Sequence, residues 1–367
     1  MLLLSALAAF SSAARAAPKG APVAVSTAAP SLIGREAVDD LAKLAVDPDP
    51  EVRALVAVAW GDLGNRAAVP TLKRALADNN ADVRIAAAGS LLELGDVQGL
   101  IALIDETKPI MSGRASSPAD ELRRMARDSA RARAALKLGE VGKGSAVEPL
   151  RSVLADPAGE VRHAAAVALA RLGQGDSTQF LDAMKDPDEG VRASAAHELG
   201  LIGRDGLVAL RNAAATDASA SVRAEAAFAL GSFSDAGSLQ ILTRALGDKS
   251  GHVRLEAAKA LAKRREPEST AALKKLAAQD PPPELALVVA AALVARGEDA
   301  DLGLAELTLE QRDPDLKSLA IAARSASKKP VARDLIAGAM RNDPDPRVRV
   351  QAAAALIGQL RRVEVKQ

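Results

Sequence analysis

The feature that most constrains the fold is a short pattern, an aspartate followed six residues later by an arginine, that recurs along the chain. Where copies adjoin, these arginines lie 30 or 31 residues apart. The interval from Arg84 to Arg162 fits two repeats plus an insertion of about sixteen residues. A period of this length is typical of stacked two-helix repeats. The clear copies are Asp47 to Arg53, Asp78 to Arg84, Asp156 to Arg162, Asp186 to Arg192, Asp217 to Arg223, Asp248 to Arg254 and Asp343 to Arg349.

Each repeat is predicted to contain two helices joined by a tight turn. The first helix has apolar residues at helical spacing, as in residues 69–78 and 147–156. The turn holds the aspartate, often followed by proline, which ends one helix and caps the next. The second helix follows the pattern VRxAAAxALxxLG, complete in residues 161–173, where Gly173 suits a left-handed closing residue. Two weak copies and one degenerate copy bring the expected count to ten: residues 280–286, 312–317 and about 120–139.

Composition supports repetition over a single large core. Aromatic residues make up 1% of the 367 residues, and there is no tyrosine or cysteine. Small residues let helices approach closely and bury area by repetition. The absence of cysteine excludes disulfides, thiolate nucleophiles and cysteine-ligated zinc. The net charge of +1, from 48 basic and 47 acidic residues, provides no overall field for nucleic acid or an anionic membrane.

The repeat of about 31 residues, with the sense xVPxLxxALxDxDxxVRxxAAxALGxLG, resembles the short HEAT-like repeat first described in phycobilisome lyases. The resemblance covers residues 34 to about 361. It implies an all-α solenoid of about ten two-helix repeats whose second helices line the concave face. It implies no universal catalytic residue, because bacterial proteins with this repeat serve as scaffolds, adaptors and lyases.

The repeated aspartates and arginines are interpreted as structural, because a residue present in every repeat supports the repeat. An arginine at the start of the second helix can donate to the turn carbonyls and to the aspartate carboxylate of its own or the adjacent repeat. We therefore expect a ladder of such contacts along the stack. Trp60 and Phe233 fall where other copies place leucine, so both are expected in the core.

A binding surface is expected at the positions that vary between copies, one and five residues after the reference arginine, which share one helix face. Much of this series is apolar, and an exposed apolar strip usually marks a partner surface. Phe228 would be its aromatic centre. The alternative is that superhelical curvature presses these residues together and leaves a groove that binds nothing. The predicted groove residues are Ile85, His163, Val167, His197, Phe228, Leu255, Lys259 and Leu287.

Catalytic and metal chemistry find little support. Metal-dependent enzymes on HEAT-like repeats would need several His-Glu pairs, and only His197-Glu198 occurs. His252 lies in a turn and His163 is followed by Ala164, so no metal or other cofactor is expected. The chain has no Gly-rich phosphate loop and no GxSxG motif. It also lacks the aromatic residues and basic stripe that single-stranded nucleic acid requires.

Several segments lie outside the regular repeats. An apolar run from Leu2 to Phe10, followed by Ala14-Arg15-Ala16, predicts a signal peptide over residues 1–16. We expect a flexible linker at 17–33, repeats over 34–362 and a tail at 363–367. The segment from Ile104 to Arg124 is interpreted as an insertion, with a loop at 106–120 that either carries contacts or is merely tolerated.

The sequence therefore predicts a non-catalytic scaffold or adaptor that binds a peptide or protein along its concave groove. The alternative is a lyase-like enzyme or enzyme chaperone. We expect a monomer without a transmembrane segment, exported to a bacterial periplasm or secreted. A cytoplasmic adaptor with a misread start is the alternative, which N-terminal sequencing of the mature protein would decide.

Overall fold

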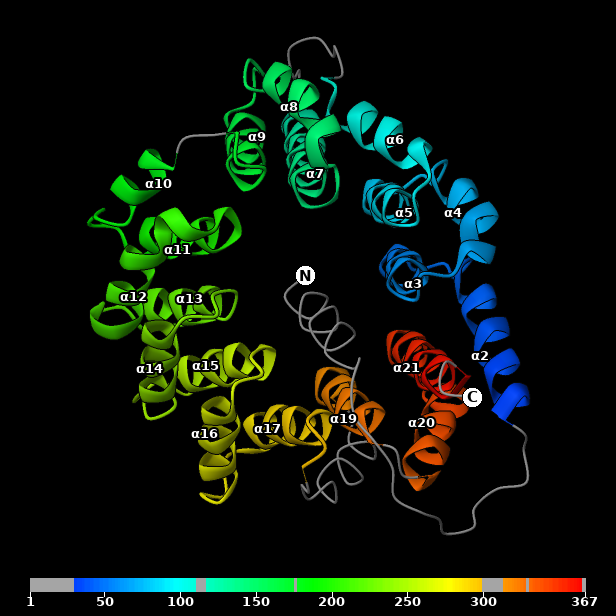
Figure 1. Cartoon of the computed structure of the whole chain (residues 1–367). Helices are drawn as coiled ribbons and strands as arrows, with labels where there is room; N and C mark the ends of the chain where they lie inside the picture. Colours follow the sequence, from blue (N-terminus) through cyan, green and yellow to red (C-terminus); the bar gives the residue numbers. More distant parts are fainter. Residues whose placement is uncertain (1–29, 110–116, 175–176, 299–312, 328–329, 365–367) are drawn as a thin grey trace. The chain divides into compact units, whose positions relative to one another are not determined.

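The structure is a computed structural model that describes residues 30–109, 117–174, 177–298, 313–327 and 330–364 (Figure 1). Every regular element in these ranges is helical, which confirms the predicted all-α repeat fold. The predicted signal peptide, most of the linker and the last residues of the tail lie outside the described ranges. Within those ranges, no helix combines the length and apolarity needed to span a bilayer.

The chain divides into two compact units. The shorter unit is residues 44–178 and the longer unit is residues 30–43 with 179 onward. In the shorter unit, second helices alternate with first helices in two layers (Figure 1). Its helices are α3 (Pro50–Asp62), α4 (Val69–Ala75), α5 (Ala81–Glu93), α6 (Val97–Thr107), α7 (Pro118–Val141), α8 (Val147–Val153) and α9 (Gly159–Arg171).

The longer unit has the same two layers, with its second helices on the inner side and its first helices on the outer side (Figure 1). The inner layer consists of α11 (Glu189–Ile202), α13 (Ala220–Leu230), α15 (Gly251–Lys263), α17 (Pro283–Ala295), α19 (Pro314–Ala326) and α21 (Pro346–Glu364). The other helices are α2 (Pro30–Leu44), α10 (Thr178–Ala183), α12 (Leu207–Thr216), α14 (Ala236–Ala245), α16 (Pro267–Ala277) and α20 (Pro330–Asn342).

Helix α2 packs against the C-terminal helices of the longer unit. Glu36 accepts a hydrogen bond of 2.5 Å from Arg341 of α20. A Cβ atom on Gly34 would lie 3.0 Å from Leu360 of α21. Ile33, Ala37 and Leu41 of α2 are buried. The first described helix thus covers the last repeat, which would otherwise expose an apolar face.

The second helices begin close to the predicted turns, but in α3, α5 and α11 the capping residue lies two positions after the repeated aspartate. Asp49, Asn80, Asp188 and Asp313 each accept a hydrogen bond from a backbone N–H in the first turn of α3, α5, α11 and α19. Proline occupies the first turn of α3, where its missing N–H costs no helical hydrogen bond. The turn chemistry read from the aspartates and prolines therefore fixes where these helices start.

Second helices end in several ways. Several close on a glycine with positive φ, and Gly173 has φ 70°, as predicted. Helix α15 has no such glycine. Instead, Arg296 of the next second helix donates to the carbonyls of Leu261 at 2.8 Å and Arg264 at 2.6 Å. Gln359 caps the end of α19 in the same manner, donating to the carbonyl of Ser325 at 3.0 Å.

Adjacent second helices approach closely because small residues face each other. A Cβ atom on Gly200 of α11 would lie 2.5 Å from the Cβ of Ala229, and one on Gly231 of α13 would lie 2.8 Å from the Cα of Ala260. Any larger side chain would force these backbones apart. Trp60 is buried in the core, as predicted, and Phe233 is also buried, as predicted.

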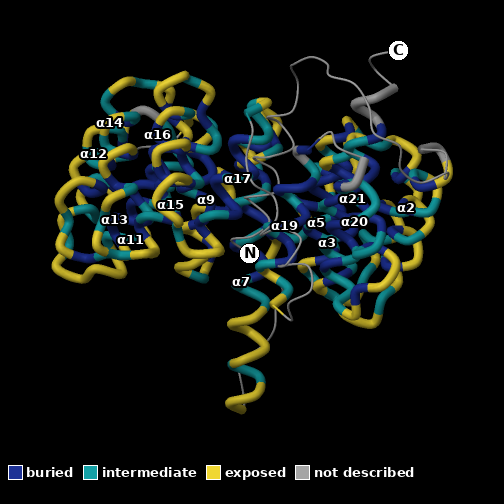
Figure 2. Tube along the Cα trace, turned by 90° about the horizontal axis from the view of Figure 1, so that it is seen from below, coloured by how far each residue is buried: buried dark blue, intermediate teal, exposed yellow. Residues whose placement is uncertain are grey.

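The expected insertion is partly helical. Helix α6 continues to Thr107 and α7 begins at Pro118, so residues 104–107 and 118–124 are helix and not loop. Ser117 caps α7 and proline follows it, which is a strong helix-start signal. The first half of α7 projects from its layer and is largely exposed, including Leu122 and Met125 (Figure 2).

Candidate functional site

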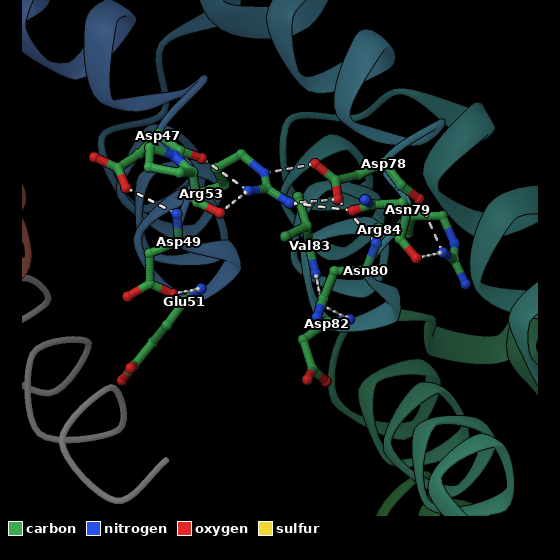
Figure 3. A network of polar contacts seen from close by, with 11 residues as sticks. Asp47, Asp49, Glu51, Arg53, Asp78, Asn79, Asn80, Asp82, Val83 and Arg84 are labelled. Carbon is green, nitrogen blue, oxygen red and sulfur yellow. Dashed lines mark hydrogen bonds and ion pairs between the residues drawn. The ribbon is translucent and has the colours of Figure 1, made fainter. Parts of the chain in front are cut away.

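Several of the repeated arginines join adjacent repeats by pairing with the aspartate carboxylate of the following repeat. Arg53 donates through Nη1 to the carbonyls of Asp47 at 2.8 Å and Pro48 at 3.0 Å in its own turn (Figure 3). Its Nε and Nη2 donate to the carboxylate of Asp78 in the next repeat, at 2.7 and 2.8 Å. Asp78 also accepts from the backbone N–H of Asn80. One guanidinium therefore closes its own turn and clamps the following turn.

The same contacts recur in other repeats. Arg192 pairs with Asp217 and Arg223 with Asp248, in both cases at 2.9 Å from Nε. Arg84 closes its own turn through the carbonyl of Asp78 but pairs with Glu106 of α6. The remaining arginines donate to the aspartate carbonyl of their own turns: Arg162 to Asp156, Arg254 to Asp248 and Arg349 to Asp343; the carboxylate of Asp186 accepts from the N–H of Asp188.

Two members of this ladder do not fit the Asp-x5-Arg pattern. Arg131 of α7 donates to the carboxylate of Asp156, to Asp128 at 2.8 Å and to the carbonyl of Thr107 at 3.2 Å. Lys317 of α19 pairs with Asp343 at 2.6 Å. Arg131 lies 31 residues before Arg162, so the period alone could have identified it although the insertion separates it from its turn.

The ladder carboxylates are held in their charged form. Hydrogen bonds from arginine lower the pKa of Asp78, Asp217 and Asp248 below the ordinary value of 3.8. These side chains are committed to joining repeats. These three aspartates therefore serve the contact between repeats and not the binding of a ligand.

The predicted groove residues separate into two groups, and four of the apolar ones are not available to a partner. Ile85, Val167, Leu255 and Leu287 are all buried, with at most 8% of their surface exposed. Ile85 and Leu287 belong to apolar clusters that also include residues of the following second helix. The expectation of an apolar binding strip at these four residues is therefore wrong.

The other predicted residues remain accessible. His163 is exposed on α9 of the shorter unit, while His197, Phe228 and Lys259 are partly exposed on α11, α13 and α15 of the longer unit. These three lie five residues after their reference arginines, on three consecutive inner-layer helices. Three more side chains, at two and nine residues after the reference, complete a group that we call the polar cluster: His197, Glu225, Phe228, Glu256, Lys259 and Lys263.

Three contacts organise the polar cluster. Nδ1 of His197 lies 3.3 Å from Oε2 of Glu225. Nζ of Lys259 donates to Oε1 of Glu256 at 2.8 Å. Nζ of Lys263, at the end of α15, lies 3.8 Å from the centroid of the Phe228 ring. An ammonium over a ring face at this distance is a cation–π interaction.

Glu225, Glu256 and Lys263 were not predicted from the sequence. The signal was present, because residues three before and four after a given helical position share its face. Glu225 lies three residues before Phe228, and Lys263 lies four residues after Lys259. Inspecting the residues three before and four after the fifth position of each second helix would have identified Glu225, Glu256 and Lys263.

The environment shifts two pKa values in the polar cluster. The hydrogen bond to the carboxylate of Glu225 raises the pKa of His197 above 6.5. Burial lowers the pKa of Lys263. The imidazole is therefore stabilised in its charged form by a neighbour, whereas the ammonium of Lys263 is only partly compensated.

We expect Glu225→Gln to lower the pKa of His197 toward its ordinary value, measured by NMR titration of the imidazole. The contribution of the His197–Glu225 pair to stability is fully present below pH 6.5. It is lost as the pH rises through the raised pKa of His197 in the folded state. The effect on unfolding should be small, since 41% of the His197 side chain is exposed. An unchanged pKa in the variant would show that Glu225 does not hold the proton.

The described residues offer no metal centre. Among them, no three histidine, aspartate or glutamate side chains come together in a way that could hold an ion. His163 and His252 are exposed on α9 and α15, in different units. What the polar cluster offers is an aromatic ring framed by charged groups, which suits recognition of a polar and apolar surface.

Comparison with known proteins places these observations in a family. The family model for HEAT repeats matches residues 38–129, 115–200 and 207–294. No curated protein matches the chain. Human deoxyhypusine hydroxylase in complex with glycerol is a similar solved structure, 22% identical over 73% of this chain and 98% of that one, with a TM-score of 0.32.

Two other solved structures are similar, each with a sequence identity below 25%. The complex of CpcE and CpcF of phycocyanin lyase from a Nostoc species is 22% identical over 62% of this chain and 97% of that one, with a TM-score of 0.39. A mutant of Kap121p is 13% identical over 93% of this chain and 45% of that one, with a TM-score of 0.36. Since the HEAT-repeat model matches more than half of the sequence, the chain belongs to the HEAT-repeat family.

Proposed function

We propose that the protein is a non-catalytic scaffold that binds a peptide or protein partner on the inner-layer helices α11, α13 and α15. The observation that carries this proposal is that one position of the second helix joins the repeats, whereas another position is accessible and varies. The reference arginine is committed to the ladder, whereas the fifth position carries a different accessible side chain in each of three consecutive repeats: His197, Phe228 and Lys259.

The chemistry of the polar cluster supports binding. Phe228 is the only aromatic residue on the described parts of these three helices, and partly exposed aromatic residues are the usual anchors of interfaces. Charged pairs on both sides of the ring provide the polar rim that excludes water from such an anchor. Because the supporting helices are fixed by the ladder, the surface is presented in one arrangement and costs little entropy to order.

The experiment is affinity capture with matched variants of the full chain. A variant with Phe228→Ala and Lys259→Glu should lose its captured proteins, identified by mass spectrometry, while keeping its unfolding midpoint. The control is Val208→Ser, which alters a residue of the outer-layer helix α12 that is 67% exposed. Capture that is equal for both variants would contradict the proposal, and turnover that depends on His197 or Glu198 would favour an enzyme.

A further inference from the structure

The charges of the polar cluster are not equally satisfied. Nδ1 of His197 contacts Glu225, and Lys259 pairs with Glu256, so four of the five titratable groups of the cluster lie in two direct contacts. Lys263 differs, because its ammonium lies over the ring of Phe228 and makes no ion pair within 4.0 Å with a described carboxylate. Lys263 is thus the lysine of the cluster whose ammonium touches the Phe228 ring and no described carboxylate.

The charged neighbours of Lys263 make their direct contacts with other groups. Lys263 is the last residue of α15, and the next residue, Arg264, turns away to donate to the carbonyl of Asp235 and to Glu266. Glu256 lies on the same helix, but its carboxylate is held by Lys259 at 2.8 Å. Burial lowers the pKa of Lys263, and the charge of Glu256 only partly opposes this shift.

An incoming carboxylate could pair with Lys263 without breaking any existing ion pair of the cluster. An incoming ammonium would face Lys263 directly and would have to compete for Glu225 or Glu256, both already paired. A carboxylate that displaces residual water from a half-buried lysine gains more than one at a fully solvated lysine. The edge of Phe228 would at the same time contact an apolar side chain next to that carboxylate.

We infer that the partner presents an acidic peptide segment, in which an aspartate, a glutamate or a terminal carboxylate stands beside a large apolar side chain. The carboxylate pairs with Lys263 and the apolar side chain packs on Phe228. This inference rests on the proposed function and adds the chemical class of the partner.

The test is selection from a display library of short random peptides on the immobilised full chain. Enriched sequences are expected to combine a carboxylate with an apolar neighbour. A fluorescein-labelled copy of the most enriched peptide should bind about tenfold more weakly to Lys263→Gln, the loss of one charged hydrogen bond. The same loss is expected when the carboxylates of the peptide are replaced by amides.

The matched control is Lys275→Gln, which removes the same charge from an exposed position of the outer-layer helix α16. Because Lys275 lies outside the polar cluster and exposed charges are screened by salt, its loss should weaken binding less than about twofold. Circular dichroism of each variant verifies that α15 remains folded.

The outcomes separate the inference from the proposed function. Enriched peptides that need Phe228 but lack carboxylates would contradict the inference that the partner is acidic. Peptides that bind Lys263→Gln as tightly as the parent would do the same. Either result would leave the scaffold proposal standing. If no enriched peptide depends on Phe228, both proposals fail.

Discussion

Replacing Arg131 with alanine is expected to lower the free energy of unfolding by about 3 to 5 kcal/mol, the usual cost of removing one partner of a buried ion pair. Only 7% of the Arg131 side chain and 3% of the Asp156 side chain are exposed. The substitution leaves the carboxylate of Asp156 buried without its guanidinium. It also removes donors to Asp128 and to the carbonyl of Thr107.

Urea denaturation followed by far-UV circular dichroism measures this effect. Arg123→Ala, on the projecting half of the same helix, is the control. Its ion pair with Asp120 has a length of 3.2 Å, and 71% of its side chain is exposed, so its loss should cost less than about 0.5 kcal/mol. Equal midpoints for the two variants would show that Arg131 does not join α7 to the following repeat.

Arg296→Ala should destabilise the longer unit by about 2 to 4 kcal/mol, because buried carbonyls lose charged donors. Arg296 donates to three carbonyls at the end of α15, those of Leu261, Ala262 and Arg264, and to the carbonyl of Ala292 in its own helix. Burial lowers its pKa to about 10, and the nearby Arg265 adds to this shift. Removal of the guanidinium therefore leaves the carbonyls at the end of α15 without donors, in a place that water reaches poorly.

The expected loss is read from the urea midpoint and from amide hydrogen exchange at the end of α15. Arg296→Lys should recover only part of the stability, since one ammonium cannot reproduce the planar fork of a guanidinium. Arg244→Ala, at an exposed position of α14, should have little effect. If exchange in α15 is as slow in Arg296→Ala as in the parent, the proposed cap contributes nothing.

The helices and their starts could be predicted because they depend on local chemistry. Asp49 and Asp188 cap α3 and α11, and their positions follow from the turn sequence alone. Gly173 closes α9 with positive φ for the same reason. The ladder partner of Arg53 in the next repeat follows from the period, once two repeats are placed side by side.

The accessible surface could be predicted only in part, because it depends on how each helix is rotated about its axis. Phe228 and Leu255 both vary between copies, so variation alone could not separate a half-exposed ring from a buried side chain. Leu255 is buried because adjacent second helices approach within the reach of small residues such as Gly231 and Ala260. Such packing is a property of the stack and not of any one repeat.

Helix caps that the next repeat supplies also cannot be predicted from the local sequence. Arg296 lies 35 residues beyond the Leu261 carbonyl that it binds. No turn motif marks Arg296 as a cap. The missing glycine after α15 is the one available clue, because a helix end without a left-handed residue needs another source of donors.

The most direct test of the separation between framework and binding surface compares two variants of α13 that lie five residues apart. Arg223 belongs to the ladder and Phe228 to the polar cluster. In the capture assay, Arg223→Ala should lower the unfolding midpoint yet retain the partners at temperatures where the protein is folded. Phe228→Ala should keep the midpoint and lose the partners. Loss of binding in folded Arg223→Ala together with full binding by Phe228→Ala would contradict the account.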